Sequence, residues 1–348
     1  MTIKEAIDKV VNRCDLAEDE MIDVMGQIMS GEATSAQIAS FITALRIKGE
    51  TVDEIVGAVK VMRNKAFNIA SFLYNEQDCS RKDKVVIDIV GTGGDAMKTF
   101  NISTTAAFVV AAGGVAVAKH GNRSVSSKCG SADVLEALGI DIVASPDNVA
   151  RHIQSVGIGF LFAPVFHASM KHAVGPRREI GIRTIFNILG PLTNPASANH
   201  LLLGVYKEEL CDVFSQVLAN LGVCRAMIVH GRDGMDEISM TTDTRVSEVK
   251  AGAISHYTIN PKDFGLELFS VGELEGGDAG ENAEIMKGIL SGRENGAKRA
   301  SVLFNAGAAF YVSGTSRGIK EGITYARDVI DSGAAIQKLE ELVEACKS

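Results

Sequence analysis

The sequence predicts an α/β protein in which a small all-helical N-terminal domain precedes a larger α/β domain with a central, mostly parallel sheet flanked by helices. Residues 1–66 show apolar positions at helical spacing and no strand pattern. From Val85 onward, short apolar runs alternate with helical segments, which is typical of a parallel sheet. At 348 residues and 46% hydrophobic composition, the chain is long enough to bury two cores.

The helical domain is expected to span residues 1–72. Two of its helix starts carry the capping-box spacing, in which the cap residue is followed three positions later by an acceptor side chain. These pairs are Thr34 with Gln37 and Thr51 with Glu54. The face of the helix that follows Thr34 is apolar, with Ile38, Phe41, Ile42 and Leu45 at helical spacing.

The larger domain is expected over residues 80–348, after a polar linker at 75–84. Its last part, from 317 to 346, shows helical patterns, and an antiparallel pair of edge strands is expected over 246–260. Buried strands are predicted where short apolar runs end at glycine or polar residues. These runs are 85–90, 115–118, 158–162, 201–205 and 226–230.

A helical insertion interrupts the α/β pattern at residues 167–194. Its sequence indicates two short helices that end at Gly190–Pro191. Such a long insertion has to bury its apolar residues somewhere, so we expect the helices around 167–190 to pack against the N-terminal domain.

Composition excludes several classes of protein. A net charge of −8 argues against a nucleic-acid-binding surface. No apolar run reaches transmembrane length and the N-terminus shows no signal-peptide pattern, so we expect a cytoplasmic protein without a membrane partner. The six cysteines are scattered without a CxxC pair, which indicates reduced thiols rather than a zinc site.

The stretch 85–139 contains the strongest functional pattern. Its first strand runs into the glycine loop GTGGD, and a hydroxyl-rich helix start follows at 101–104. The next strand supplies the cations Lys119 and Arg123. Backbone N–H groups of a glycine loop and of a helix start both bind anions. With two cations beside them, the pattern predicts a site for a polyanion.

Three other interpretations of the glycine loop compete with this one. The segment Gly91–Ala96 fits the dinucleotide fingerprint G-x-G-x-x-A, but that site needs an acidic residue about 20 residues later, where Lys119 and His120 stand. A Walker A loop requires glycine before Lys98, and the chain has Met97 there. The third is a purely structural strand–turn–helix. The basic residues favour a phosphate site of another kind.

Six blocks of sequence, in order, resemble the anthranilate phosphoribosyltransferase family of the nucleoside phosphorylase/phosphoribosyltransferase glycosyltransferases. GTGGD also occurs in the related pyrimidine nucleoside phosphorylases, whereas KHGNR and the block at 177–195 are more specific. The resemblance covers nearly the whole chain and implies transfer of phosphoribosyl from phosphoribosyl pyrophosphate (PRPP) to the amine of anthranilate in tryptophan biosynthesis. The blocks are GTGGD (91–95), NIST (101–104), KHGNR (119–123), GSADVLEALG (130–139), RREIGIRTIFNILGPLTNP (177–195) and DGMDEIS (233–239).

The resemblance implies that the glycine loop, the helix start and the basic strand end hold PRPP. Lys119 is the main candidate for neutralising negative charge on the departing diphosphate, because preorganised cations and N–H groups stabilise such charge. The implied PRPP-binding residues are Gly91, Gly94, Asp95, Thr99, Asn101, Ile102, Ser103, Thr104, Lys119, His120, Gly121, Asn122, Arg123, Ser124, Val125, Ser126, Ser127 and Ser131.

The resemblance also assigns Asp236 and Glu237, with the Ser103 hydroxyl, to Mg²⁺, at two ions per active site. Mg²⁺ prefers hard oxygen ligands and often reaches a diphosphate through one or two carboxylates. For an acidic pair considered alone, the ordinary interpretation is a solvated turn. The residues expected to act in catalysis are Lys119, Ser103, Asp236 and Glu237.

Arg177 is expected to bind the carboxylate of anthranilate, because a guanidinium can pair with a carboxylate through two parallel hydrogen bonds. Arg178 is adjacent, and the choice between the two rests on alignment of the motif. The resemblance also places Asn122 and the Gly91 backbone at the aromatic amine. That amine is neutral at pH 7, so we assign His120 a positioning role rather than base catalysis.

Two other functions compete with this assignment. A pyrimidine nucleoside phosphorylase on the same scaffold would lack the KHGNR and NILGPLTNP blocks. A catalytically idle relative could bind PRPP only, although every motif position here carries a suitable side chain. The family further implies a homodimer formed through the helical domain, and the apolar helices at 35–66 are compatible with that.

Overall fold

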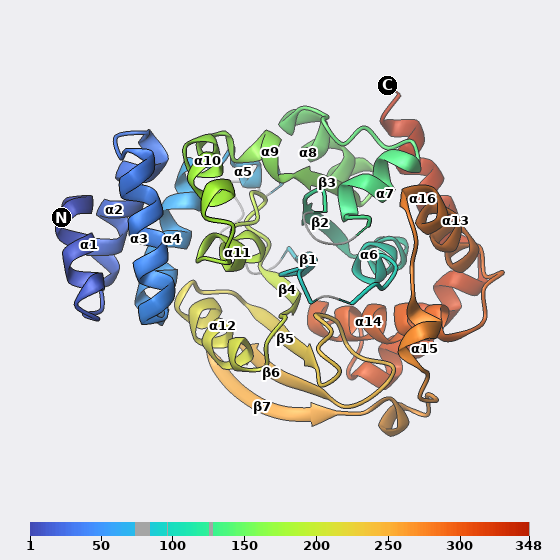
Figure 1. Ribbon diagram of the computed structural model, residues 1–348. Helices are drawn as coiled ribbons and strands as arrows, with labels where there is room; N and C mark the ends of the chain where they lie inside the picture. Colours follow the sequence, from blue (N-terminus) through green and yellow to red (C-terminus); the bar gives the residue numbers. More distant parts are fainter. Residues whose placement is uncertain (74–83, 96, 125–127, 348) are drawn as a thin grey trace.

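The computed structural model describes residues 1–73, 84–95, 97–124 and 128–347. Figure 1 shows a group of N-terminal helices beside a larger body built around a seven-stranded sheet. This arrangement confirms the predicted fold class. The N-terminal helices are α1 (Ile3–Val11), α2 (Glu18–Ser30), α3 (Ser35–Lys48), α4 (Val52–Lys65) and α5 (Ala70–Leu73).

Local sequence signals set the starts of α3 and α4. The side chains of Thr34 and Thr51 each accept a hydrogen bond from the backbone N–H three residues later, and Gln37 and Glu54 accept the threonine N–H groups in return. Both predicted capping boxes are therefore confirmed. Phe41, on the apolar face of α3, is fully buried.

The strands form one sheet in the order β3-β2-β1-β4-β5-β6-β7. Strands β1 to β5 pair in parallel, whereas β6 and β7 form the predicted antiparallel pair at the edge. Each of the five predicted buried strands begins within one residue of its expected start. The strands are β1 (Val86–Gly91), β2 (Ala116–Gly121), β3 (Ile158–Phe162), β4 (His200–Gly204), β5 (Arg225–Gly231), β6 (Thr244–Lys250) and β7 (Ala253–Ile259).

The chain direction across the sheet reverses at β1, which has β2 on one side and β4 on the other. In open α/β sheets, ligands bind at the carboxyl ends of the strands where such a reversal occurs. The glycine loop leaves β1 at this end. The topology therefore places the predicted phosphate site at the usual ligand position of the fold.

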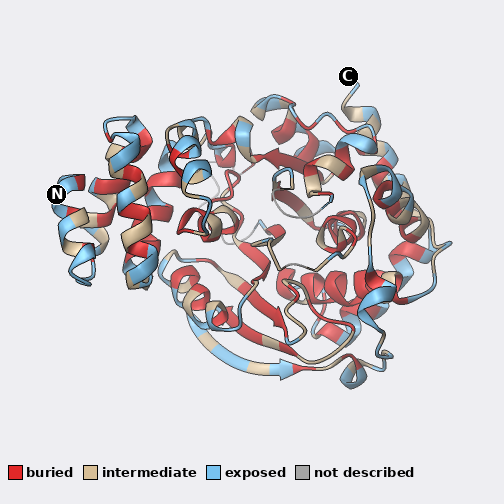
Figure 2. Cartoon of the chain, viewed as in Figure 1, coloured by how far each residue is buried: buried red, intermediate tan, exposed pale blue. Residues whose placement is uncertain are grey.

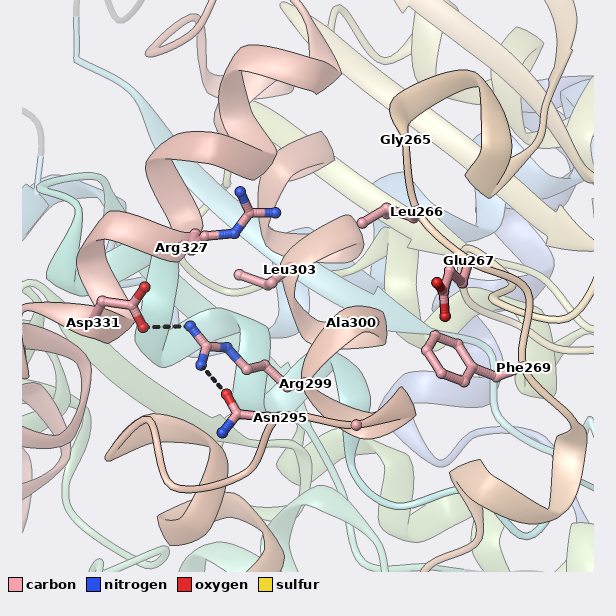
Figure 3. Close-up of a pocket in the computed structure, with 11 residues that line it drawn as sticks. Gly265, Leu266, Glu267, Phe269, Asn295, Arg299, Ala300, Leu303, Arg327 and Asp331 are labelled. Carbon is pink, nitrogen blue, oxygen red and sulfur yellow. Dashed lines mark hydrogen bonds and ion pairs between the residues drawn. The ribbon is translucent and has the colours of Figure 1, made fainter.

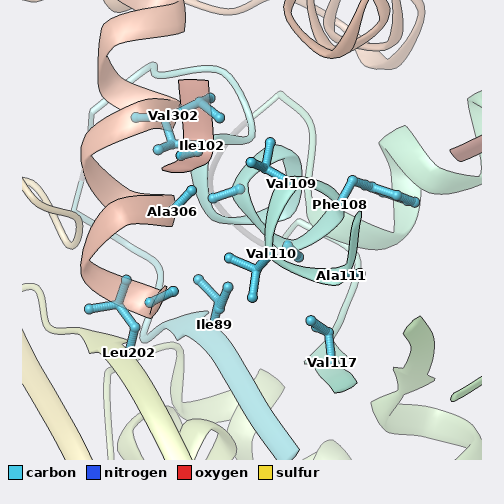
Figure 4. Close-up of a cluster of buried hydrophobic side chains, with 14 of the residues drawn as sticks. Ile89, Ile102, Phe108, Val109, Val110, Ala111, Val117, Leu202, Val302 and Ala306 are labelled. Carbon is cyan, nitrogen blue, oxygen red and sulfur yellow. The ribbon is translucent and has the colours of Figure 1, made fainter. Parts of the chain in front are cut away.

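Different helices cover the two faces of the sheet. Ile89 and Leu202 pack with Val302 on the face covered by α6 and α14 (Figure 4), while Leu201 and Leu203 join the core shared by α12 and the N-terminal helices. Strand β7 at the outer edge is mostly exposed (Figure 2). Apart from the two α-helices of the insertion, the other α-helices of the described residues are α6 (Ile102–Ala112), α7 (Ser131–Ala137), α8 (Pro146–Ser155), α9 (Ala163–Phe166), α12 (Glu209–Asn220), α13 (Ala279–Leu290), α14 (Ala297–Ser313), α15 (Ile319–Asp331) and α16 (Ala334–Ala345).

The helical insertion forms α10 (Lys171–Ile180) and α11 (Phe186–Leu189). Helix α10 contacts α2 and α3, and α11 contacts α4. Arg63 of α4 donates from Nε to the Leu192 carbonyl oxygen at 2.8 Å. The insertion therefore connects the N-terminal helices to the large domain. The exact division of the chain between residues 72 and 80 stays a prediction.

Most of the predicted linker, residues 75–83, lies outside the described residues. The five cysteines in the described part of the chain are all free thiols. Within that part, too, every helix is too short or too polar to cross a lipid bilayer.

Candidate active site

The glycine loop lies between β4 and the acidic pair. The backbone N–H of Thr92 donates to the Gly204 carbonyl oxygen at 2.9 Å, and that of Gly93 donates to Asp236 Oδ2 at 2.6 Å. A Cβ atom on Gly91 or on Gly204 would overlap Asp236. Glycine is therefore needed at both positions for the carboxylate to approach the backbone this closely.

The acidic pair bridges the glycine loop and the start of α6. While Asp236 accepts from the loop, Glu237 Oε1 accepts the backbone N–H of Ser103 at 3.0 Å. The next residue, Ile238, donates its N–H to Asn305 Oδ1 of α14 at 3.1 Å, which fixes the pair to the core. The sequence predicted free N–H groups at this helix start, whereas Glu237 already binds one of them.

Burial raises the pKa of each carboxyl group in this cluster. The pKa of Glu237 is raised to about 8 and that of Asp95 to about 7, first by burial and then by the charge of Asp236. Burial also raises the pKa of Asp236, although its hydrogen bond from the Gly93 N–H favours the ionised form. Carboxylates crowded in this way favour a nearby cation.

The cluster supplies some, but not all, of the ligands that a hard metal ion needs. Carboxylate and hydroxyl oxygens are ligands that Mg²⁺ prefers, and a protein usually supplies only one or two carboxylates to it. In the described part of the chain, no group of three or more His, Cys, Asp or Glu side chains could hold a metal by itself. The residues Asp236, Glu237 and Ser103 therefore fit a Mg²⁺ ion that takes its other ligands from substrate and water.

Lys119 is the buried cation of the site, with 3% of its surface exposed. Its Nζ donates to the Ile89 carbonyl oxygen at 2.7 Å and lies 3.5 Å from Ser103 Oγ. Burial lowers the pKa of Lys119, whereas Asp88 and Glu237 favour its charged form. The side chain thus places its ammonium group between β1, the start of α6 and the acidic pair.

A buried network that the sequence analysis missed supports β2 beside Lys119. Asp88 Oδ1 accepts the His120 N–H at 3.2 Å, and Asp88 Oδ2 accepts from Asn194 Nδ2 at 2.7 Å. Asn194 also donates to the Ala118 carbonyl oxygen at 2.8 Å. Burial raises the pKa of Asp88 to about 6. The sequence did contain one signal of this network: Asp88 lies inside an apolar strand, and a buried carboxylate needs buried partners.

His120 is held in one tautomer. Its Nδ1 lies 3.1 Å from the Gly190 carbonyl oxygen, so Nδ1 carries the proton and Nε2 is left as an acceptor. Among the described residues, neither Nε2 of His120 nor Nε2 of His167 has a partner, and the two ring centroids are 5.1 Å apart. Burial lowers the pKa of His120 to about 3 and that of His167 to about 4. Both rings are therefore neutral.

The segment after β2 is organised by Asp133. The N–H groups of Ser124 and Gly130 donate to Asp133 Oδ2 at 3.0 Å and 2.8 Å. Ser131 Oγ donates to the Asn122 carbonyl oxygen at 3.2 Å. These bonds bring the predicted residues Asn122, Ser124 and Ser131 close to one another.

Arg123 does not join Lys119 as the second cation of the cluster. Its guanidinium donates to Asp133 Oδ1 at 2.9 Å and to the two carboxylate oxygens of Glu136 at 2.8 Å and 3.0 Å. The sequence analysis expected both cations at one place, but it did not foresee that α7 would supply these two carboxylates. The assignment of Arg123 to PRPP stays a prediction.

Two predicted PRPP-binding residues contact α13 or the segment before it. Thr99 forms an isolated β-bridge with Glu275. The Asn101 side chain accepts from Asn282 Nδ2 at 3.0 Å and donates to the Cys129 carbonyl oxygen at 3.4 Å, and it does not cap α6. Both residues thus help to attach the loop 97–101 to the rest of the domain.

The other predicted PRPP-binding residues are backbone positions around α6 and β2. Ile102 and Thr104 are buried in the first turn of α6. Gly121 ends β2, and a Cβ atom there would overlap Ser131. Three predicted residues lie outside the described part of the chain: Val125, Ser126 and Ser127.

Arg177 and Arg178 are neighbours on α10 but differ in burial. Arg177 is half-buried, with its guanidinium carbon 5.3 Å from the centroid of the Phe186 ring, whereas Arg178 is exposed. Burial lowers the pKa of Arg177. Among the described residues, neither arginine forms an ion pair. A half-buried guanidinium without a carboxylate partner is suited to bind an anion from solution.

Arg183 is a further residue at the glycine loop that the sequence analysis did not single out. Its guanidinium donates to the Gly94 carbonyl oxygen and lies 4.2 Å from the centroid of the Tyr206 ring. Gly94 has a φ of +73°, and a Cβ atom there would overlap the guanidinium. The only available signal was the presence of an arginine within the block 177–195.

A separate cavity of about 460 Å³ lies between the segment 265–269 and helices α14 and α15 (Figure 3). None of the predicted site residues lines it. Arg299, its buried cation, already donates to Asn295 Oδ1 at 2.7 Å and to Asp331. The candidate active site is thus defined by convergent polar contacts at the end of β1 rather than by this cavity.

Comparison with known protein families identifies the class to which the fold belongs. Residues 4–66 match the helical bundle domain of a glycosyl transferase family, and residues 83–336 match the α/β domain of such a family. The protein is therefore a glycosyl transferase by fold. Individual relatives of known name define the family more narrowly, and the chain belongs to the anthranilate phosphoribosyltransferase family.

Two relatives and two solved structures illustrate this membership. Anthranilate phosphoribosyltransferase of Citrifermentans bemidjiense is 57% identical over 98% of each chain, and that of Acetivibrio thermocellus is 56% identical over 99% of this chain and 97% of its own. The Thermus thermophilus enzyme has a TM-score of 0.90 at 41% identity, covering 99% of each chain. The Saccharomyces cerevisiae enzyme in complex with PRPP and Mg has a TM-score of 0.87 at 29% identity, covering 99% of this chain and 98% of that one.

Proposed function

We propose that this protein transfers the 5-phosphoribosyl group of PRPP to the amine of anthranilate, giving N-(5-phosphoribosyl)anthranilate and diphosphate in tryptophan biosynthesis. The observation that supports this most is the convergence of the glycine loop, Ser103, Lys119 and the acidic pair at the end of β1. Membership of the family and the PRPP- and Mg-bound yeast relative agree with it.

The chain's own groups suit the departure of diphosphate. Displacement at the anomeric carbon builds positive charge on the ribose while negative charge grows on the leaving group. The Lys119 ammonium is held by the Ile89 carbonyl oxygen before substrate arrives, so it can stabilise that charge without reorganising. In this proposal, Ser103 and the other predicted PRPP-binding residues orient the donor around these groups.

Mg²⁺ is the proposed cofactor, with two ions per active site, held by Asp236, Glu237 and the Ser103 hydroxyl. When bound, it supplies Lewis-acid stabilisation to the diphosphate oxygens. The carboxylates hold their place without it, because Gly93 and the Ser103 backbone already donate to them. Burial raises the pKa of both carboxyl groups, and a bound cation would favour their ionised forms.

On the acceptor side, Arg177 is proposed to pair with the carboxylate of anthranilate. Asn122 and the Gly91 backbone are proposed to position the amine, which attacks as a neutral nucleophile. His120 is neutral and presents an Nε2 that is unpaired among the described residues, so it can accept a hydrogen bond from a substrate N–H but cannot act as a cation. Support for Arg177 over Arg178 comes from the half-burial of Arg177.

We further propose a cytoplasmic homodimer that assembles through the helical domain. Two large apolar side chains on its helices are exposed in the single chain, Val11 at 63% and Ile47 at 68%. These two side chains are compatible with such an assembly, and the main support for it is the family resemblance. Sedimentation of the purified protein tests the assembly, and a monomer at micromolar concentration would contradict it.

A single assay tests the proposed reaction. Purified protein is mixed with PRPP, anthranilate and Mg²⁺, and the loss of anthranilate fluorescence is followed. We expect turnover only when all three are present, with one diphosphate released per anthranilate consumed. Phosphorolysis of uridine without turnover of anthranilate would favour the pyrimidine nucleoside phosphorylase alternative, and PRPP binding without any turnover would favour the idle relative.

A further inference from the structure

We propose that Arg183 is a positioning residue that fixes the glycine loop from the side of the helical insertion. Its role is to keep Gly93 and Gly94 where their backbone groups meet the acidic pair and the donor. The residue lies outside the set assigned above to PRPP, anthranilate or metal. The proposal rests on the proposed function, because it takes PRPP as the ligand of the loop.

The glycine loop is bonded at two consecutive residues by side chains from two different segments. The Gly93 N–H donates to Asp236 Oδ2 at 2.6 Å, and the Gly94 carbonyl oxygen accepts from the Arg183 guanidinium. Gly94 adopts a φ of +73° that L side chains rarely adopt, and a Cβ atom would overlap the guanidinium. Arg183 and Asp236 therefore act together as a clamp on two adjacent glycines.

Tyr206 fixes the guanidinium itself. Its ring centroid lies 4.2 Å from the guanidinium carbon, a distance typical of a cation–π contact. The Tyr206 backbone N–H donates to Thr92 Oγ1 at 3.1 Å, so the tyrosine is bonded to the beginning of the same loop. The loop is thus contacted at Thr92 by the segment after β4 and at Gly94 by Arg183.

The backbone that carries Arg183 is anchored on the side of the helical domain. Thr184 N donates to Asn187 Oδ1 at 3.0 Å, which fixes the turn that leads into α11. Helix α11 contacts α4, and Arg63 of α4 donates to the Leu192 carbonyl oxygen just beyond α11. Arg183 therefore connects the donor loop to an element that the N-terminal helices hold in place.

Arg183 does not form an ion pair at the surface with any described residue. In the described part of the chain, no Asp or Glu forms a salt bridge with it. Its positive charge instead favours the ionised form of Asp236. A solvated surface arginine would show neither the loop contact nor the aromatic stack, so the arrangement supports a role at the loop.

The test compares Arg183→Ala and Arg183→Lys with Arg178→Ala as a matched control, since Arg178 is an exposed arginine of the same insertion. We expect Arg183→Ala to weaken PRPP binding roughly tenfold, the order expected for loss of a hydrogen bond to a charged group. Calorimetry with PRPP and Mg²⁺, without acceptor, measures this. The KM for anthranilate should change less than about twofold, and Arg183→Lys should recover part of the loss.

A second pair of variants separates positioning from general stability. Tyr206→Leu removes the ring that holds the guanidinium and should weaken PRPP binding in the same direction, whereas Tyr206→Phe keeps the ring and should bind as the wild type does. The double variant Arg183→Ala/Tyr206→Leu should be little worse than Arg183→Ala, because both changes act through one contact.

Unchanged PRPP binding in Arg183→Ala, or a larger effect on anthranilate, would overturn the proposal. Full additivity in the double variant would do the same. A loss of PRPP binding that merely follows a lower thermal unfolding temperature, and that Arg178→Ala reproduces, would also reject it. Failure of the proposed function is distinguishable, since wild-type protein would then bind PRPP without consuming anthranilate, or would not bind PRPP at all.

Discussion

Around the glycine loop, side chains and backbone bind one another closely, whereas around Arg177 and His120 several polar groups have no partner within the described residues. Asp236 and Glu237 each accept a backbone N–H, and Lys119 Nζ is bonded to the Ile89 carbonyl oxygen. By contrast, Nε2 of His120 is buried and, within the described part of the chain, unpaired. The proposed donor side is thus largely bonded within the chain, and the proposed acceptor side is not.

This difference follows from what each side has to recognise. Stabilising charge that develops in a transition state requires dipoles and cations that are already in place. Selecting one small acceptor instead relies on polar groups that a wrong ligand would leave unpaired. The guanidinium of Arg177, which forms no ion pair among the described residues, is therefore the group from which we expect specificity for the acceptor.

The largest expected effect on turnover comes from substituting the acidic pair of the proposed donor side. Changing Asp236→Asn together with Glu237→Gln removes both carboxylates proposed to bind the metal, and we expect turnover with Mg²⁺ to fall by roughly 10³-fold or more, since a metal's charge stabilisation contributes several kcal/mol. Because burial raises the pKa of both groups, the neutral amides should not lower the thermal unfolding temperature. Near-normal activity would show that the pair has no role in metal binding and is an ordinary acidic turn.

The next effect concerns the support of the donor side and depends on pH. Asp88 has a pKa of about 6 in the folded protein, against 3.8 for the ordinary group. Between these values the folded state holds a proton that the unfolded state has released, so the free energy of unfolding falls as pH rises from about 4 to about 6. The change amounts to about 3 kcal/mol and should be absent from Asp88→Asn.

Urea unfolding of both proteins between about pH 4 and pH 7 measures this, because titrating groups that do not interact with Asp88 contribute equally to the two proteins. The wild-type curve should approach and then fall below that of the variant as pH rises. Asn at position 88 still offers an oxygen to the His120 N–H, so the variant is expected to fold. Parallel curves would show that Asp88 does not retain a proton in the fold.

The two sides also differ in how much of them the sequence reveals. The strand, the glycine loop and the capping threonines Thr34 and Thr51 follow from residues that are neighbours in the chain, and the structure confirms them. The link between Asp88 and Asn194 joins residues 106 positions apart. No local pattern encodes such a pair, because its partner is chosen by the packing of the sheet against the insertion.

Arg123 and Arg183 show the same limit of sequence analysis: one was included in the charge cluster although it is bound elsewhere, and the other was overlooked. Sequence reasoning counted Arg123 as a cation of the site, but carboxylates of α7 bind it on the surface. It passed over Arg183, which contacts Gly94 across 89 residues. Residue type and position in a motif predict that a charge is present, whereas only the fold determines what that charge meets.

The smallest expected effect, and the sharpest test of the acceptor side, concerns Arg177. Its proposed contact is the carboxylate of anthranilate, remote from the carbon under attack, so it should act on acceptor binding rather than on diphosphate departure. Loss of a charge-assisted hydrogen bond costs about 1.5–3 kcal/mol, or roughly ten- to a hundredfold in affinity. Steady-state kinetics of Arg177→Ala should show a KM for anthranilate raised by that factor and a nearly unchanged KM for PRPP.

Two companion variants sharpen this last comparison. Arg177→Lys should recover only part of the loss, because an ammonium keeps the charge but not the paired donors of the guanidinium. Arg178→Ala, at the exposed neighbour, should change the KM for anthranilate much less. If Arg178→Ala has the larger effect, or if Arg177→Ala mainly weakens PRPP, then Arg177 belongs to the donor side, and the half-buried guanidinium on α10 is not what selects the acceptor.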